Sequence, residues 1–299
     1  MSLPFFSVIV PTRSRPNRLA TCVDGLGRLS YPPDRFEVIV VDDGSEREVQ
    51  VQHAGSLRLR VVRQEHSGPA AARNLGVAHA DGDHVAFLDD DCVPHPGWLT
   101  AFADRFAKLR EPVLGGSTVN GLPDNPYSTA SQLLVSYLYL YQRRGNASQP
   151  PFFTSNNLAL TAGSFRKLGG FSKRFRLAAG EDREFCARAL DAGLLLEYVP
   201  DAIVAHSHPL GLRSFSRQHY DYGRGAFDFH QHRNEDRKGA GLRPEPTRFY
   251  LGMVSYPSAA RRRSRLVLGG LLALSQIATA TGFLREAVSS RRTTTTKRG

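Results

Sequence analysis

Short apolar runs alternate with stretches of helical periodicity over the first 120 residues. The runs cover residues 6–10, 36–41, 59–62 and 85–88, and each is followed by a proline or a polar residue. Helical periodicity lies at residues 17–29, 69–80 and 98–109. This alternation predicts a Rossmann-like α/β fold, with a mostly parallel sheet and helices on both faces. Such sheets bind ligands at the carboxyl ends of their strands.

The pattern is less regular after residue 112. Residues 128–141, 181–192 and 213–230 predict helices, and residues 195–199 predict a short strand. A polar segment covers 154–160, and a Gly-Gly-Phe turn covers 169–171. An apolar segment at 266–284 predicts a C-terminal helical extension, whereas residues 289–299, with a run of threonines, are predicted to be disordered.

Composition and charge narrow the classes of protein. A hydrophobic content of 41% with 22% charged residues is typical of a folded globular chain. Three scattered cysteines form no CxxC pair, which argues against a disulfide framework or a cysteine zinc ribbon and fits a reducing cytosol. Residues 201–299 carry 17 Lys and Arg against 7 Asp and Glu, and this basic third predicts contact with phosphate of lipid or nucleic acid.

Two acidic clusters directly follow predicted strands. Asp42 and Asp43 could accept hydrogen bonds from a nucleobase or a ribose, or form an ordinary Asp-Gly turn. Asp89, Asp90 and Asp91 repel one another unless a cation or hydrogen-bond donors compensate. Oxygen ligands of this kind suit Mg²⁺ or Mn²⁺ bridging to a diphosphate, and the alternative is a solvated acidic loop.

Three further positions could carry chemistry. Asp182 opens a helix, where it either acts as a general base or complements the helix dipole. His206 and His208 follow an apolar strand and are either metal ligands or structural histidines. Gly68 begins a helix of small residues, which permits close approach of a diphosphate. The sequence has no GxGxxG, GxxxxGK[ST], GxSxG or HExxH motif, which disfavours the usual dinucleotide, P-loop, hydrolase and zincin classes.

These phrases occur in an order that resembles the family 2 glycosyltransferases of the GT-A fold, which transfer a sugar from a nucleotide donor with inversion. The resemblance covers about residues 5–225. It rests on Ser-Val-Ile-Val-Pro-Thr at 7–12, Val-Val-Asp-Asp-Gly-Ser at 40–45, Ala-Arg-Asn at 72–74, Gly-Asp at 82–83, Phe-Leu-Asp-Asp-Asp at 87–91, Gly-Gly-Phe at 169–171, Glu-Asp at 181–182, and His206.

The resemblance implies a nucleotide-sugar site. Pro11, Thr12 and Asp43 would line the nucleoside pocket, with Asp42 beside them. Arg13 follows at a position where relatives often carry an aromatic residue. Arg73 would lie near the base or the diphosphate, and Asp90 near the ribose and the donor sugar. Gly68 and Asp89 complete the expected donor site.

The resemblance also implies the reacting groups. Asp91 would be the principal ligand of Mn²⁺ or Mg²⁺, and Asp89 is the first member of the DxD-type motif. His206 matches a further metal ligand of some relatives, with His208 competing for that role. Asp182 matches the catalytic base, which would remove the acceptor's proton through an oxocarbenium-like transition state.

The expected activity is transfer of one sugar to a glycan or a lipid-linked acceptor, in the synthesis of glycolipid, lipid-linked glycan or cell-surface polysaccharide. The Gln-x-x-Arg-Trp motif of processive relatives is absent from the sequence, which favours single transfer. The expected domains are a glycosyltransferase domain at 1–225, with a nucleotide half at 1–120 and an acceptor half at 113–225, then a basic extension at 226–288 and a tail at 289–299.

The apolar segment at 266–284 has arginines on both sides, which disfavours a simple span because one basic cluster would have to cross the bilayer. A helix lying in or re-entering the interface is favoured over a spanning or a soluble packing helix. The chain is therefore expected at the cytoplasmic face of the cell membrane, as a peripheral protein.

Three other functions remain as alternatives. A catalytically inactive homologue could bind nucleotide and act as a membrane scaffold. A nucleotidyltransferase is disfavoured because the N-terminal region has no Gly-rich, Lys-bearing loop for a triphosphate. Nucleic acid is not an expected partner, because aromatic residues are sparse after Tyr256 and the acidic clusters would repel phosphate in the absence of metal.

Overall fold

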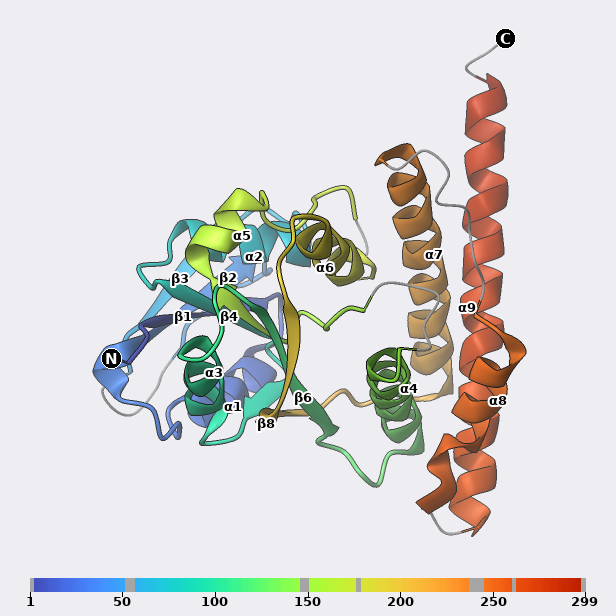
Figure 1. The fold of residues 1–299 in the computed structure, drawn as a ribbon, viewed down its shortest axis with the longest axis horizontal. Coiled ribbons are helices and arrows are strands. Elements are labelled where there is room, and N and C mark those ends of the chain that lie inside the picture. Colours follow the sequence, from blue (N-terminus) through green and yellow to red (C-terminus); the bar gives the residue numbers. More distant parts are fainter. Residues whose placement is uncertain are drawn as a thin grey trace. The chain divides into compact units, whose positions relative to one another are not determined.

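The computed structural model describes residues 3–51, 57–145, 151–175, 179–236, 245–259 and 262–296. The chain divides into two compact units (Figure 1). The sheet unit comprises Met1–Gly121, Phe152–Arg176 and Asp182–Ser207, and the helical unit comprises Leu122–Pro151, Leu177–Glu181 and His208–Gly299.

The sheet unit is built on one eight-stranded sheet with the order β3-β2-β1-β4-β7-β6-β8-β5. Parallel pairing joins β1 to β2 and β4, β2 to β3, and β6 to β8, whereas β7 is antiparallel to both neighbours and β5 is antiparallel to β8. The strands are β1 Phe6–Thr12, β2 Phe36–Asp43, β3 Leu59–Gln64, β4 His84–Leu88, β5 Cys92–Pro94, β6 Val113–Asn120, β7 Asn157–Thr161 and β8 Leu196–His206.

Helices cover both faces of this sheet. Alternate residues of a strand point to opposite faces, so Val8 of β1 joins the core under α1 and α3 while Ile9 faces α2, where Gly76 packs against it. The predicted mostly parallel α/β fold with helices on both faces is confirmed. The helices are α1 Pro16–Leu26, η1 Pro33–Arg35, α2 Pro69–Ala78, α3 Trp98–Phe106, α5 Ala162–Lys167 and α6 Glu181–Asp191.

β7 is tied into the sheet by a buried asparagine at its first position. The Asn157 amide donates to the backbone carbonyls of Ser117 and Ala202, at 3.0 and 2.9 Å. The Trp98 indole donates to its side-chain oxygen at 2.8 Å. All polar atoms of this side chain are therefore used, which removes the cost of burying an amide.

A second polar network closes the amino-terminal ends of β1 and β2. Glu37 is buried, and its carboxylate accepts from the Ser7 hydroxyl at 2.6 Å, from the Asp81 backbone N–H at 2.8 Å and from Arg60 at 3.0 Å. The Ser7 hydroxyl in turn accepts from the Gly82 N–H at 2.9 Å. Each carboxylate oxygen has a donor, as a buried charge requires.

The helical unit consists of α4 Pro126–Arg143, α7 Leu212–Asp236, α8 Thr247–Ser255, η2 Tyr256–Ala259 and α9 Arg262–Thr296. Tyr137, Phe249 and Leu272 belong to a core shared by α4, α8 and α9. α7 and α9 touch at the backbone, because a Cβ at Gly223 would collide with the Thr279 carbonyl and a Cβ at Gly282 with the Tyr220 carbonyl.

The expected domains, with a glycosyltransferase domain to residue 225 and a tail from residue 289, stay predictions. The contacts divide the two units at Ser207 and His208, and α7 runs through residue 225. α9 continues to Thr296, and residues 297–299 lie outside the described residues.

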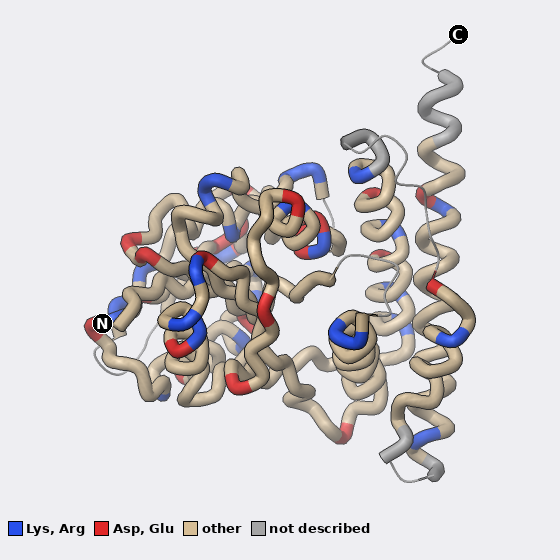
Figure 2. The backbone as a smooth tube through the Cα atoms, in the orientation of Figure 1, with Lys and Arg blue, Asp and Glu red and all other residues tan. Residues whose placement is uncertain are grey.

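α9 is apolar over most of its length. Residues 266–284 carry no charged side chain, as the tan tube of Figure 2 shows. Within the described part of the chain, Ser264–Ser290 of this helix is the one stretch long and apolar enough to cross a membrane, with a mean hydropathy of 1.6.

Candidate active site

The acidic triplet lies at the carboxyl end of β4, next to the ends of β1 and β8. β4 ends at Leu88, and a backbone hydrogen bond from Cys92 to the Asp89 carbonyl closes the turn that carries the triplet. Cys92 of β5 pairs with His206 of β8, and the Ser207 N–H continues this antiparallel ladder to the Asp91 carbonyl at 2.8 Å. The pairing of β5 with β8 thus brings His206 to Asp91.

Asp90 is buried under the end of β1. The Thr12 hydroxyl donates to one of its oxygens at 2.7 Å, and Arg15 approaches the other at 3.3 Å. Burial raises the pKa of Asp90 to about 6, with the neighbouring Asp91 and Asp89 charges adding to the rise and Thr12 and Arg15 opposing it. The Asp90 carboxylate therefore changes its protonation state close to neutral pH.

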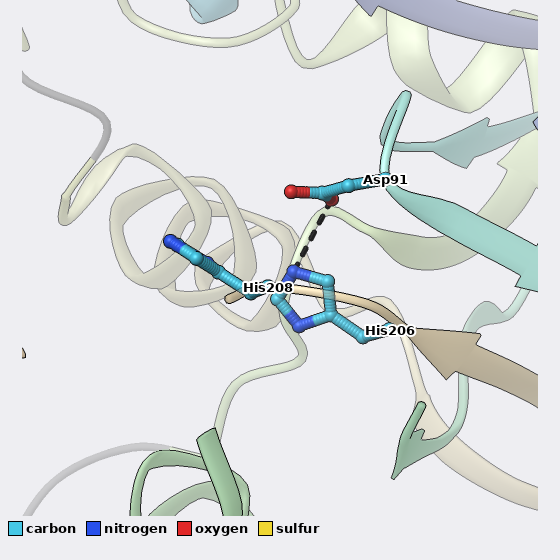
Figure 3. Close-up of side chains that lie close together, drawn as sticks. All are labelled: Asp91, His206 and His208. Carbon is cyan, nitrogen blue, oxygen red and sulfur yellow. Dashed lines mark ion pairs between the residues drawn. The ribbon is translucent and has the colours of Figure 1, made fainter. Parts of the chain in front are cut away.

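Asp91 is the point where cationic and imidazole groups converge. Arg18 of α1 donates to it at 3.1 Å, and the His206 Nε2 lies 3.2 Å from its other oxygen (Figure 3). Burial alone would lower the pKa of His206, but the Asp91 carboxylate outweighs it, so the pKa is raised. The His206 ring is thus positioned by its interaction with the Asp91 carboxylate.

His208 offers a third ligand atom at the same place. Ligand atoms of Asp91, His206 and His208 lie within 4.8 Å of one another. His208 is the first residue of the helical unit, so Asp91 and His206, which both belong to the sheet unit, carry the argument. A carboxylate oxygen beside an imidazole nitrogen is a donor set that Mn²⁺ accepts readily.

Asp89 pairs with Arg73 of α2. The guanidinium is buried and donates to Asp89 at 2.7 Å, and it lies over the Phe171 ring with its carbon 5.7 Å from the centroid. Asn74 fixes the turn that holds this ring, since its amide exchanges two 2.8 Å hydrogen bonds with the Phe171 backbone. Gly170 must lack a side chain here, because its φ is +72° and a Cβ would lie 2.6 Å from the Asn74 oxygen.

Asp182 lies in the first turn of α6, half-buried, and accepts from the Arg183 N–H at 2.7 Å. Burial raises its pKa above the ordinary value, while the positive charges of Arg183 and Arg73 act in the opposite direction. Arg73 therefore interacts electrostatically with both Asp89 and Asp182. A carboxylate with a raised pKa in a structured turn is suited to receive a proton near neutral pH.

Asp43 organises the loop that leads into α2. Its two oxygens accept from the Gln64 side chain at 2.7 Å and from the backbone N–H groups of Ser67 and Gly68 at 2.8 and 3.0 Å, and His66 lies at 2.9 Å. Burial alone would raise the pKa of Asp43, but these hydrogen bonds outweigh it and lower the pKa. Asp43 therefore shapes this loop as well as the end of β2.

Asp42, Pro11 and Arg13 lie around the same strand ends. Asp42 accepts from the Ser45 N–H at 2.8 Å, which is the Asp-Gly turn that the sequence allowed. Pro11 of β1 lies opposite Val41 of β2. Arg13 is exposed, and its guanidinium lies 3.0 Å from the His66 ring.

Two arginines of the site were not anticipated from the sequence. Arg15 and Arg18 lie one helical turn apart where α1 begins, directly after β1, and both contact the acidic triplet. Their spacing of three residues at a predicted helix start indicates that both side chains lie on one face of the helix, since residues i and i+3 are neighbours there.

Comparisons with known proteins agree with this geometry. The family model for glycosyl transferase family 2 matches residues 7–169. Pre-mycofactocin glycosyltransferase of Mycobacterium tuberculosis is 32% identical over 226 residues, which are 74% of this chain and 46% of that protein. Glycosyltransferase AglE of Haloferax volcanii is 30% identical over 216 residues, 70% of this chain and 69% of that protein. The chain thus spans about half the length of the first of these relatives.

Solved structures show the same fold. A mannosyltransferase of Pyrobaculum calidifontis, in complex with GDP-Man and Mn²⁺, superposes with a TM-score of 0.61 at 18% identity and covers 93% of this chain and 87% of its own. TarS 1-349 of S. aureus, in complex with UDP-GlcNAc, gives a TM-score of 0.52 at 19% identity, with coverage of 96% and 92%. Fold, ordered motifs and family model agree, and the chain belongs to glycosyl transferase family 2.

Proposed function

We propose that this chain transfers one sugar from a nucleotide-sugar donor to an acceptor hydroxyl, with inversion and with Mn²⁺ or Mg²⁺. The observation that carries the proposal is the pairing of buried Asp91, a member of the acidic triplet, with His206 at the strand ends, in the unit that also contains Asp182. Arg73, Arg15 and Arg18 offset part of the repulsion among the three carboxylates. A divalent ion that bridges to a diphosphate would offset more of it.

Asp91 and His206 would hold the ion, with Asp89 nearby and His208 as an alternative ligand. The residues fit such an ion because ligand atoms of Asp91 and His206, one oxygen and one nitrogen, lie within 4.8 Å of each other. When bound, the ion supplies positive charge that stabilises the departing nucleoside diphosphate.

Arginines provide the remaining positive charge on the donor side. Arg73, Arg15 and Arg18 contact the triplet and would contribute to the electrostatic environment of the diphosphate. α2 begins at Pro69 with three alanines, and small residues in a first turn permit close approach of a phosphate. Gly68, at the N-cap, has a φ of +90° that a residue with a side chain rarely adopts.

The nucleoside would lie against Pro11, Thr12, Asp43 and Arg13. Thr12 links this region to the reacting end, because its hydroxyl donates to Asp90. Arg13 is exposed beside His66 and offers a planar cation where an aromatic residue would otherwise stack on the base.

Asp182 would act as the base. Its carboxylate receives the acceptor's hydroxyl proton as the acceptor oxygen bonds to the anomeric carbon and the bond from that carbon to the diphosphate oxygen breaks. A single displacement of this kind inverts the anomeric configuration and needs no sugar bound covalently to the protein. The raised pKa of Asp182 favours proton acceptance.

The proposed acceptor is a glycan or a lipid-linked glycan, in the synthesis of glycolipid, lipid-linked glycan or cell-surface polysaccharide at the cytoplasmic face of a membrane. Relatives named hyaluronan synthase, from Pasteurella multocida, and chondroitin synthase, from Escherichia coli, are 28% and 27% identical over 242 and 240 residues. Their names support a glycan acceptor for this chain.

A panel of nucleotide sugars with Mn²⁺ or Mg²⁺ tests the proposal in two steps. Thermal stabilisation by one donor identifies the nucleotide, since a ligand that binds the native state raises the melting temperature. NMR of the product from that donor then reports the anomeric configuration. We expect inversion, and expect Asp182→Asn to bind the donor as the wild type does while transfer is lost.

Two results would contradict the proposal. Retention of configuration would reject the single displacement. A donor that binds but is never turned over with any glycan acceptor would favour the inactive scaffold instead.

A further inference from the structure

One side of α9 presents an apolar stripe to solvent. Leu266, Ile277 and Leu284 are 74%, 65% and 63% exposed, and Val288 is also exposed. These positions are 11, 7 and 4 residues apart, which are sums of three- and four-residue steps and place them on one line along the helix. The α9 stripe comprises Leu266, Gly270, Ala273, Ile277, Thr281, Leu284 and Val288, and all but the partly exposed Ala273 are exposed.

The opposite side of α9 is already used within the helical unit. Leu272 and Ser275 are buried, and the Thr279 hydroxyl donates to the His219 carbonyl of α7 at 3.1 Å. Glu286 accepts from Arg224 of α7 at 2.7 Å. The stripe therefore lies on the side of the helix that has no role in the fold of this unit.

Charge around the stripe is almost entirely positive. Residues 246–299 contain ten Lys and Arg and a single acidic residue, Glu286, which is paired with Arg224. Arg265 and Arg285 lie at the two ends of the uncharged segment. A lengthwise apolar stripe with basic ends matches the chemistry of an anionic bilayer surface, which offers acyl chains below phosphate groups.

We infer that α9 lies flat on an anionic lipid surface, with the α9 stripe inserted among the headgroups and the arginines on their phosphates. α8 packs against α9 beside Gly269 and adds Leu251, which is 69% exposed, to the apolar surface of this unit. This inference concerns where the chain binds and stands independently of the proposed glycosyl transfer.

The packing of α7 against α9 favours an α9 that lies parallel to the membrane surface. α7, which touches α9 at the backbone through Gly223 and Gly282, contains eight charged residues. A spanning α9 would have to take this helix into hydrocarbon or break the contacts of Thr279 and Glu286. Lying flat keeps every one of these contacts.

A second copy of the chain is a poorer occupant of the stripe. Helices that pair through an apolar stripe normally place opposite charges beside it. Here the flanking charges of α9 are arginines, and the one acid is turned toward α7. Pairing two such helices would bring like charges together, whereas anionic lipid neutralises them.

Vesicle sedimentation of the full chain tests the inference. We expect binding to vesicles of phosphatidylcholine mixed with phosphatidylglycerol, much weaker binding to phosphatidylcholine alone, and loss of binding as salt rises. The double variant Ile277→Asp with Leu284→Asp should bind the mixed vesicles at least about tenfold more weakly, since both apolar insertions are lost.

The matched control is Val61→Asp with Leu195→Asp, which places the same charges on exposed apolar positions of the sheet unit and should bind as the wild type does. Arg285→Gln, which leaves the stripe intact, should weaken binding severalfold and reduce its salt dependence. Melting temperatures of all variants establish that the exposed substitutions leave the fold intact.

Three outcomes would overturn the inference. The first is sedimentation of the stripe variant with mixed vesicles as strongly as the wild type. The wild type could resist extraction from vesicles by alkaline carbonate, which would indicate a spanning helix. Finally, sedimentation velocity could show a wild-type dimer that Ile277→Asp with Leu284→Asp dissociates, without vesicle binding.

Discussion

The two ends of the sheet bury carboxylates in opposite ways. At the amino-terminal end, Glu37 receives a hydroxyl, a backbone N–H and a guanidinium, so its charge is matched within the fold. At the carboxyl end, Asp90 and Asp91 are buried side by side with Asp89 next to them. Their cationic partners Arg15 and Arg18 are partly exposed and reach in from the first turn of α1.

The difference separates a structural acid from a functional one. A fully matched carboxylate stabilises the native chain and leaves nothing for a ligand to gain. A crowded triplet keeps electrostatic energy that a divalent ion would release on binding. Burial alone does not distinguish these cases, since Glu37, Asp90 and Asp91 are all almost inaccessible to solvent. The number and type of their hydrogen-bond and ion-pair partners distinguish them.

The largest expected effect is the loss of turnover when Asp91, at the carboxyl end of the sheet, is changed. Asp91→Asn keeps the size of the side chain but removes the charge, and we expect turnover to fall by about 10³-fold or more. The free energy of unfolding without ligand should change by less than about 1 kcal/mol, because one repulsive charge is also removed. Steady-state kinetics and chemical denaturation measure the two quantities, and near-normal turnover would refute the assignment.

The amino-terminal end should respond in the reverse manner. Glu37→Ala removes the buried acceptor of the Ser7 hydroxyl, the Asp81 N–H and one Arg60 hydrogen bond, and should lower the free energy of unfolding by about 3 kcal/mol. Turnover per folded molecule should stay within about twofold of the wild type. Glu37→Gln, which retains an acceptor oxygen, is the matched control and should cost less.

His219 of α7 is a third kind of buried ionisable group, beside the matched Glu37 and the crowded triplet. Its ring nitrogens have no hydrogen-bond partner among the described residues. Burial lowers its pKa to about 4. The unfolded chain, with an ordinary histidine pKa near 6.5, then binds more protons than the native chain between these values. Stability is therefore full above about pH 6.5 and falls by roughly 2–3 kcal/mol as the pH drops to 4.

Denaturation of His219→Leu across this range checks the effect. The variant should lose this part of the pH dependence, whereas His79→Leu, at an exposed position, should keep the wild-type slope. An unchanged slope in His219→Leu would show that the native chain accommodates the imidazolium.

The smallest expected effect sharpens the argument about the arginines. Arg18 lies 3.1 Å from Asp91 and competes with any cation there, so Arg18→Gln should tighten binding of Mn²⁺ alone by about two- to fivefold. Electron paramagnetic resonance of free Mn²⁺ measures this directly. Arg28→Gln, at an exposed position beyond α1, should leave the affinity unchanged; weaker binding by the Arg18 variant would reverse our interpretation.

The parts of the fold that the sequence predicted are those fixed by local pattern. β1, β2 and β4 are built on apolar runs, and β3 carries two adjacent valines, so their strand character can be read from a few residues. β6 contains Gly115 and Gly116, and β7 begins at Asn157, so neither resembles a strand locally. Their strand conformation depends on partners far away in the chain, such as the Ala202 carbonyl that Asn157 meets.

The same limit applies to the candidate site. Asp89, Asp90 and Asp91 are recognisable because like charges seldom stand together without cause. Arg15 and Arg18 reach the triplet only because β1 and β4 are neighbours in the sheet, which no local pattern states. The contacts of Asp43 with Gln64 and Gly68 likewise depend on how β3 and its following loop return to β2.

The glycine contact between α7 and α9 has a consequence for mutational tolerance. Because Gly223 and Gly282 each face a carbonyl of the other helix, one methyl group at either position forces the two backbones apart. Neither position bears charge or lies in the unit that holds the triplet. Temperature-sensitive alleles of this protein are to be sought at these two glycines, where the smallest possible enlargement separates a whole helix from its neighbour.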